Sequence, residues 1–186
     1  MSERILTREF SICLLPNTKT ARQVSMLRSK LPASPYRDDV PHITLLRGVS
    51  SAGEMSDEAL VHDMRSLLAI SNHLPLYATA RQIVNKSDEL YRSSSVVPLD
   101  ASDDLLAYRT RITTTLAKHH YAIEAQELTE YAPHITIRLG VPLEGSNYKL
   151  AQKLFEGEAI SFDQWFLFRL VLIDGKRAMH EVQPPL

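Results

Sequence analysis

The sequence PHITLLRG occupies residues 41–48, and PHITIRLG occupies residues 133–140. Both octapeptides begin with Pro-His-Ile-Thr and end on glycine, and their histidines, His42 and His134, lie 92 positions apart. In a chain of this length and composition, Pro-His-Ile-Thr is expected only about 0.001 times by chance. Two copies therefore indicate an internal duplication. Duplication alone does not establish an active site, because a structural repeat would also preserve the histidines.

Helix signals recur on both sides of the two octapeptides. Residues 18–31 place apolar side chains on one helical face. Ser56 and Ser102 are each followed by two acidic residues, the pattern of a capped helix start, and Ser146 is predicted to open a fourth helix. Ser56 and Ser146 each follow a motif and lie 90 positions apart, close to the 92 positions that separate the motif histidines.

Strand signals complete the repeat. β-branched, aromatic or alternating stretches predict strands over residues 10–15, 75–84, 89–97 and 161–173. Two further short strands are expected at His42 and His134, each starting after a proline that cannot donate to a central ladder. Each half then consists of strand, helix, motif strand, helix and strand. We expect one bilobal domain over residues 1–186, with repeat halves of about 1–86 and 87–186.

Composition, net charge and cysteine content indicate which partners and which cell compartment to expect. The 186 residues are 44% hydrophobic and 23% charged, with a formal net charge of -1, which is typical of a globular domain and does not favour binding to long duplex nucleic acid. The single cysteine cannot form an internal disulfide, and no run approaches the ~20 apolar residues of a membrane span. We expect a cytoplasmic protein, a monomer, with no membrane partner and with a nucleotide or an RNA end as substrate.

The motif residues have the chemistry of a phosphoryl-transfer site. In a strand, residues i and i+2 share a face, so His42 and Thr44 point one way and Ile43 and Leu45 point to the core; His134 and Thr136 follow the same rule. Two histidines that meet in one cleft can act as general base and general acid, because their pKa near 6.5 makes both protonation states accessible at neutral pH. The threonine hydroxyls can hydrogen-bond the non-bridging phosphate oxygens. This chemistry needs no metal and no cofactor.

Two His-x-Thr motifs in a duplicated chain of this size resemble the 2H phosphoesterase superfamily, especially its 2'-5' RNA ligase (LigT-like) and cyclic phosphodiesterase branches. The resemblance implies an α+β fold of two pseudo-symmetric lobes, each an antiparallel sheet flanked by helices, around a central cleft. It also implies a phosphodiesterase acting on 2',3'-cyclic phosphates or 2'-5' linkages of RNA ends or nucleotides, and hence a role in RNA processing. The family's catalytic positions correspond here to His42, Thr44, His134 and Thr136.

The flanks of the two motifs differ, so substrate contacts rest on weaker arguments. Arg138 shares the parity of His134 and Thr136 and is a candidate for binding phosphate. Arg47 has the opposite parity and is not expected to reach the site. Tyr131, just before the second motif, and Tyr36, in a loop before the first, are candidates for stacking on a base.

Two other readings stay open. A non-catalytic module of the same fold could bind a nucleotide or RNA end, and a phosphodiesterase could act on a non-RNA substrate. A metal-dependent hydrolase is disfavoured because a zinc site needs three or four ligands and the motifs group only two histidines. The sequence leaves undecided which histidine is acid and which is base, the product isomer, and whether the cell uses hydrolysis or ligation.

Overall fold

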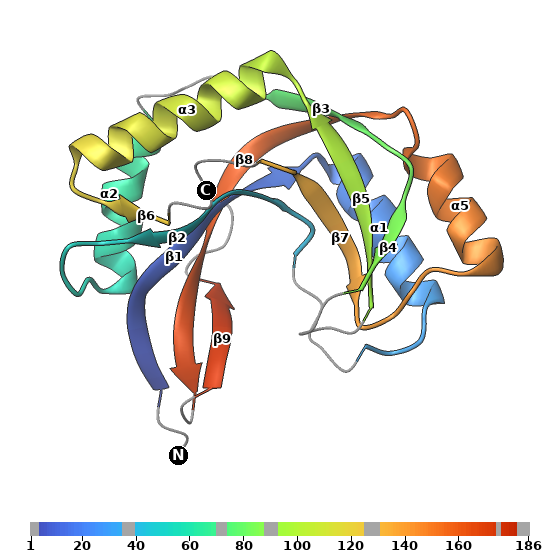
Figure 1. Cartoon of the computed structure of the whole chain (residues 1–186), viewed down its shortest axis with the longest axis horizontal. Helices are drawn as coiled ribbons and strands as arrows, with labels where there is room; N and C mark the ends of the chain where they lie inside the picture. The colour runs from blue at the N-terminus through green and yellow to red at the C-terminus, as the bar shows by residue number, and fades with distance from the viewer. Residues whose placement is uncertain are drawn as a thin grey trace.

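The computed structural model of the protein describes residues 4–34, 40–69, 74–87, 93–124, 131–173 and 176–181. Within these ranges the elements follow the predicted double order of strand, helix, motif strand, helix and strand, with three short strands added (Figure 1). The predicted α+β class, an antiparallel sheet flanked by helices, is confirmed.

The strands form one continuous, strongly curved antiparallel sheet. Its order is β4-β5-β3-β8-β1-β2-β6, while β7 adds to β5 and β9 adds to β8. The strands are β1 (Arg4–Pro16), β2 (Ile43–Ser50), β3 (Leu76–Ala80), β4 (Val84–Lys86), β5 (Ser94–Ala101), β6 (Ala122–Ile123), β7 (His134–Leu139), β8 (Ala159–Ile173) and β9 (Lys176–Glu181). β7 begins at His134 as predicted, whereas β2 begins at Ile43, one residue after the predicted start at His42.

Four described helices cover the sheet: α1 (Thr18–Lys30), α2 (Asp57–Ala69), α3 (Asp103–Lys118) and α5 (Gly145–Phe155). The predicted caps of α2 and α3 are present, because Ser56 Oγ accepts from Ala59 N at 3.2 Å and Ser102 Oγ accepts from Leu105 N at 3.2 Å. The predicted start of the last helix at Ser146 is wrong. Glu144 takes the cap position of α5 without a side-chain hydrogen bond, so Ser146 lies inside the first turn.

The two sequence halves are interleaved in space. Helix α1 from the first half packs against β7 and α5 of the second half. Helix α3 from the second half packs against α2 and β2 of the first half. Strand β8 pairs with both β1 and β3 and so runs through both parts of the sheet (Figure 1). One part of the sheet contains β1, β2 and β6, and the other contains β3, β4, β5 and β7. Each part is therefore built from residues of both repeats.

The main core lies between the sheet and its helices. Ile43, Leu45, Ile135 and Ile137 of the motif strands are 0% exposed and belong to it, which confirms the predicted inward face of each motif. A second, small apolar cluster lies apart from the main core and consists of Cys13, Phe166 and Phe168. None of the helices in the described ranges combines the length and apolar character that crossing a bilayer requires.

Candidate active site

The two motif strands are not paired in the sheet, but β2 and β7 approach each other although 92 residues separate the motif histidines. β2 carries Thr44 and follows His42, and β7 begins at His134 and carries Thr136. All four side chains are half-buried, whereas the isoleucines between them are fully buried. The fold thus keeps each His-x-Thr pair on the face opposite the core.

Both histidines are oriented by the same type of hydrogen bond. His42 Nδ1 lies 2.7 Å from the carbonyl oxygen of Val40, and His134 Nδ1 lies 3.1 Å from the carbonyl oxygen of Ala132. A carbonyl only accepts, so Nδ1 carries the hydrogen in both rings. In each ring the protonation of Nε2 therefore distinguishes the neutral from the charged form. The His42 ring also packs on Phe168 of the small apolar cluster, with ring centroids 4.9 Å apart.

The surroundings favour the neutral form of His134. Burial is the main cause that lowers the pKa of His134, and the hydrogen bond to Ala132 opposes it by favouring the charged ring. The positive charges of Lys86 and Arg47, and the His42 ring, lower this pKa further. A ring with such a pKa is mostly unprotonated at neutral pH, and Nε2 is then a proton acceptor.

A β-bulge follows the threonine in each motif strand. In the pairing of β1 with β2, Cys13 faces Thr44 while Ile12 faces Leu46, so Leu45 is the extra residue. In the pairing of β5 with β7, Val96 faces Thr136 while Ser95 faces Arg138, so Ile137 is the extra residue. A bulge reverses the inside–outside alternation of the residues that follow it, up to the next irregularity, which in β2 lies between Leu46 and Val49.

This reversal overturns the parity argument for the two arginines. Arg138 is 8% exposed and its Nη1 donates to the carbonyls of Leu31 and Pro32, beyond the end of α1, so the side chain is engaged in holding that segment. Arg47, which the uninterrupted alternation directs away from the site, is exposed and close enough to lower the pKa of His134.

Comparisons of the structure with solved structures give a consistent result. A crystal structure titled phosphoesterase matches with a TM-score of 0.53 and 16% identity, covering 97% of this chain and 95% of that one. TT0787 of Thermus thermophilus matches with a TM-score of 0.58 and 13% identity, covering 94% of this chain and 95% of that one. E. coli LigT complexed with NADP+ matches with a TM-score of 0.50 and 18% identity, covering 99% and 96%.

The chain has a LigT-like fold. At these identities the likeness is one of fold, and it extends over almost the whole of each chain. No protein-family model matches the sequence, and no curated protein matches it.

Within the LigT-like fold, the two tyrosine candidates have different outcomes. The ring of Tyr131 is half-buried and lies under the Arg109 guanidinium, 4.5 Å from Arg109 Cζ to the ring centroid. One face of the Tyr131 ring is therefore covered by Arg109 and is not available for stacking on a base. Tyr36 lies outside the described residues.

Lys86 of β4 is a residue near the site that the sequence analysis did not single out. It lowers the pKa of His134 through its charge, although β4 is far from both motifs in sequence. The pairing of β4 with β5, and of β5 with β7, puts Lys86 in the same part of the sheet, although its backbone is level with Leu139, at the end of β7 away from His134. A strand-pairing prediction would have been needed to find it, because no local pattern marks this lysine.

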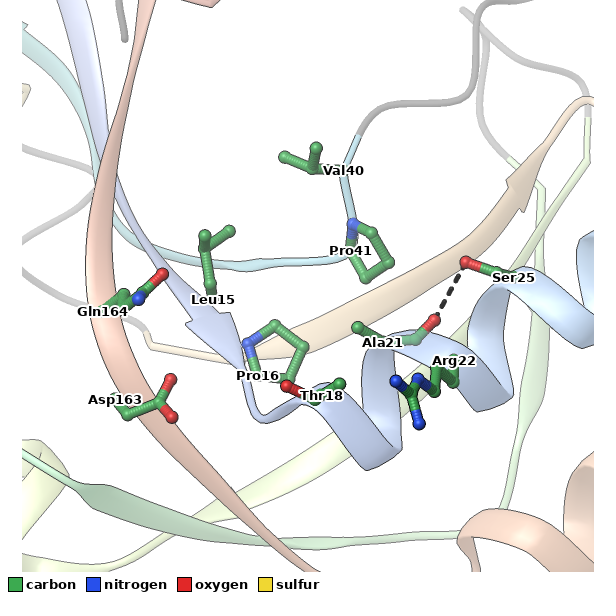
Figure 2. Close-up of a pocket in the computed structure, with 10 residues that line it drawn as sticks. All are labelled: Leu15, Pro16, Thr18, Ala21, Arg22, Ser25, Val40, Pro41, Asp163 and Gln164. Carbon is green, nitrogen blue, oxygen red and sulfur yellow. Dashed lines mark hydrogen bonds between the residues drawn. The ribbon is translucent and has the colours of Figure 1, made fainter. Parts of the chain in front are cut away.

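A pocket of about 330 Å3 opens beside the first motif strand of the LigT-like fold (Figure 2). Neither histidine lines it, but Val40, whose carbonyl accepts from His42, does. The other lining residues are Pro41, which precedes β2, and residues of β1, α1 and β8: Leu15, Pro16, Thr18, Ala21, Arg22, Ser25, Asp163 and Gln164. The pocket is thus a neighbour of the histidine pair and not the place where they meet.

The described residues contain no group of three or more histidine, cysteine, aspartate or glutamate side chains that could hold a metal ion. The candidate site has two imidazoles and two hydroxyls, and the positive charges of Arg47 and Lys86 act on His134. Such a set suits an anionic ligand whose reaction requires proton transfer.

Proposed function

We propose that the protein is a metal-independent phosphodiesterase that hydrolyses 2',3'-cyclic phosphates or 2'-5' linkages of RNA ends or nucleotides, with His42 and His134 as general acid and base. One observation carries the proposal. Thr44 and Thr136 lie on two strands that approach each other, each next to its motif histidine, and each imidazole is held through Nδ1, which leaves Nε2 as the nitrogen for proton transfer. A nucleotide substrate is supported by the LigT structure, which was crystallised with NADP+.

The lowered pKa of His134 supports this ring as the general base and leaves the part of general acid to His42. His134 Nε2, unprotonated at neutral pH, takes the proton of the attacking water as its oxygen bonds to phosphorus. His42, protonated at Nε2, gives its proton to the leaving 2' or 3' oxygen as that phosphorus–oxygen bond breaks. Thr44 and Thr136 donate hydrogen bonds to the non-bridging oxygens, where negative charge is held. The products are a phosphate monoester and a free hydroxyl, and solvent exchange resets the two rings.

The test is hydrolysis of the four nucleoside 2',3'-cyclic monophosphates in excess chelator. The wild type is expected to turn over, and His42→Ala and His134→Ala are each expected to lose about 100-fold or more, the usual contribution of a positioned acid or base. Circular dichroism checks that both variants are folded. Near wild-type turnover by either variant, or full loss of wild-type activity in chelator, would contradict the mechanism.

A second arm uses 2'-5'-linked dinucleotides under the same conditions. Turnover of these but not of the cyclic monophosphates places the substrate among 2'-5' linkages. Binding of nucleotides without turnover of any of these compounds favours the non-catalytic module of the same fold.

A further inference from the structure

Two arginines bind the bulges that follow the threonines of the motifs. Arg109 of α3 donates from Nε to the carbonyl of Leu45 at 3.1 Å. Arg28 of α1 donates from Nε to the carbonyl of Ile137 at 2.6 Å and from Nη2 to the carbonyl of Thr136 at 3.1 Å. Leu45 and Ile137 are the extra residues of the two bulges, so the arginines act at equivalent points of the repeat.

The contact has a clear physical cause. The extra residue of a bulge is left out of the strand ladder, and a buried carbonyl without a partner is costly. Leu45 and Ile137 are both 0% exposed, and the guanidinium supplies the missing donor. Hydrogen bonds from a charged donor are stronger than neutral ones, and the planar fork of arginine also fixes their direction.

The arrangement is crossed between the two halves of the chain. Arg28 belongs to the first repeat and binds the second motif strand, whereas Arg109 belongs to the second repeat and binds the first. Each bulge begins one residue after a motif threonine, and Arg28 reaches the carbonyl of Thr136 itself. A shift of either guanidinium would therefore move the backbone that carries Thr44 or Thr136.

We propose that Arg28 and Arg109 are a matched pair of positioning residues, Arg28 for His134 and Thr136 and Arg109 for His42 and Thr44. The inference rests on the proposed phosphodiesterase function. The two arginines touch no reacting atom; they fix the bulges and thereby the angle at which each His-x-Thr pair meets the phosphate. Displacements of about 1 Å at such a distance from the chemistry can cost about 100-fold in rate.

Steady-state kinetics of Arg28→Gln and Arg109→Gln form the first test. We expect each to lose about tenfold or more in kcat, the fold-change that loss of a charged hydrogen bond produces, with KM changed less than about threefold. Arg28→Lys and Arg109→Lys keep the charge but lack the fork, so they should also lose activity. Arg111→Gln, an exposed arginine of α3, is the control. Wild-type kcat in the lysine variants would show that charge alone matters and overturn the proposal.

Double variants separate positioning from general destabilisation. Arg109→Gln should add little to Thr44→Ala and its full effect to Thr136→Ala, and Arg28→Gln should show the reverse, because only coupled residues are non-additive. Arg109 also lies over Tyr131. Tyr131→Leu combined with Thr44→Ala tests whether Arg109 acts on Thr44 through this ring. We expect the activity losses of these two substitutions to be additive. Additive losses in every arginine–threonine combination would contradict the assignment.

A readout without turnover distinguishes this proposal from the proposed function. In NMR spectra, Arg28→Gln should shift the amide signals of Ile137 and Arg138 and the ring signals of His134, leaving those of residues 42–46 in place. Arg109→Gln should shift the signals of Leu46 and His42. If the wild type turns over none of the substrates, these shifts still decide whether the arginines position the motifs. Uniform shifts of both motifs in both variants would overturn the crossed pairing.

Discussion

At the scale of single residues, His134 combines burial with several positive neighbours. Arg47 is the neighbour that the first motif itself supplies, two residues beyond the bulge. Removing this charge makes the protonated ring less unfavourable, so Arg47→Gln is expected to raise the pKa of His134. The acidic limb of the pH–rate profile should move to higher pH by the same amount. NMR titration of the His134 ring measures the shift directly, with Arg65→Gln, on exposed α2 surface, as the control.

The same pKa also links His134 to stability. In the unfolded chain the ring is protonated below about pH 6.5, whereas the folded ring stays neutral to a lower pH because its pKa is lowered. Between these two pKa values the unfolded state binds the extra proton, so the free energy of unfolding falls as pH falls. His134→Gln should reduce this loss. Urea unfolding at pH 7.5 and pH 5.0 measures it, and an unchanged difference between the two pH values would contradict the lowered pKa.

The sequence predicts which face of the strand each candidate site residue occupies, as far as the local alternation holds. His42, Thr44, His134 and Thr136 were placed on one face of their strands because nothing interrupts the alternation before Leu45 or Ile137. Beyond those bulges the same reasoning exchanged the orientations of Arg47 and Arg138. No hydrophobic pattern marks a bulge whose extra residue is itself apolar. Arg28 and Arg109 were missed because their partners are backbone carbonyls more than 60 residues away.

At the scale of elements, the helix starts were predictable where a cap is followed by acidic residues. Ser102 and Ser56 fulfil both conditions, and both cap their helices. Ser146 has no acidic residue in its first turn, and the helix begins earlier, at Gly145. Pairing of strands could not be predicted, because β8 joins β1 and β3 across more than 70 residues of sequence.

The two serines make a matched pair of variants. Ser102→Ala removes the acceptor for Leu105 N and is expected to lower the free energy of unfolding by about 1 kcal/mol. Ser146→Ala is the control, because Ser146 is exposed and occupies the first turn rather than the cap position. Alanine has the higher helix propensity there, so we expect no loss. Equal losses in urea unfolding for the two variants would show that α5 starts at Ser146 after all.

At the scale of the whole molecule, the repeat in sequence and the lobes in space do not coincide. β1 and β2 of the first repeat share their part of the sheet with β8 and β6 of the second. β3 and β4 share theirs with β5 and β7. The exchange of α1 and α3 follows the same pattern. Each motif strand is consequently packed by a helix of the other repeat, α1 on β7 and α3 on β2.

This interleaving makes the chain suitable for fragment complementation. Cut between β4 and β5, it yields residues 1–87 and 88–186, and each piece carries one His-x-Thr motif but lacks the strands and the helix that complete its apolar core. Each fragment alone is expected to be unfolded or aggregated, and co-expression is expected to restore one assembled unit with both motifs. Size-exclusion chromatography of tagged fragments measures this. A fragment that folds by itself would mean that each repeat is an autonomous folding unit. The chain could then not serve as a split reporter, in which activity requires that the two fragments assemble.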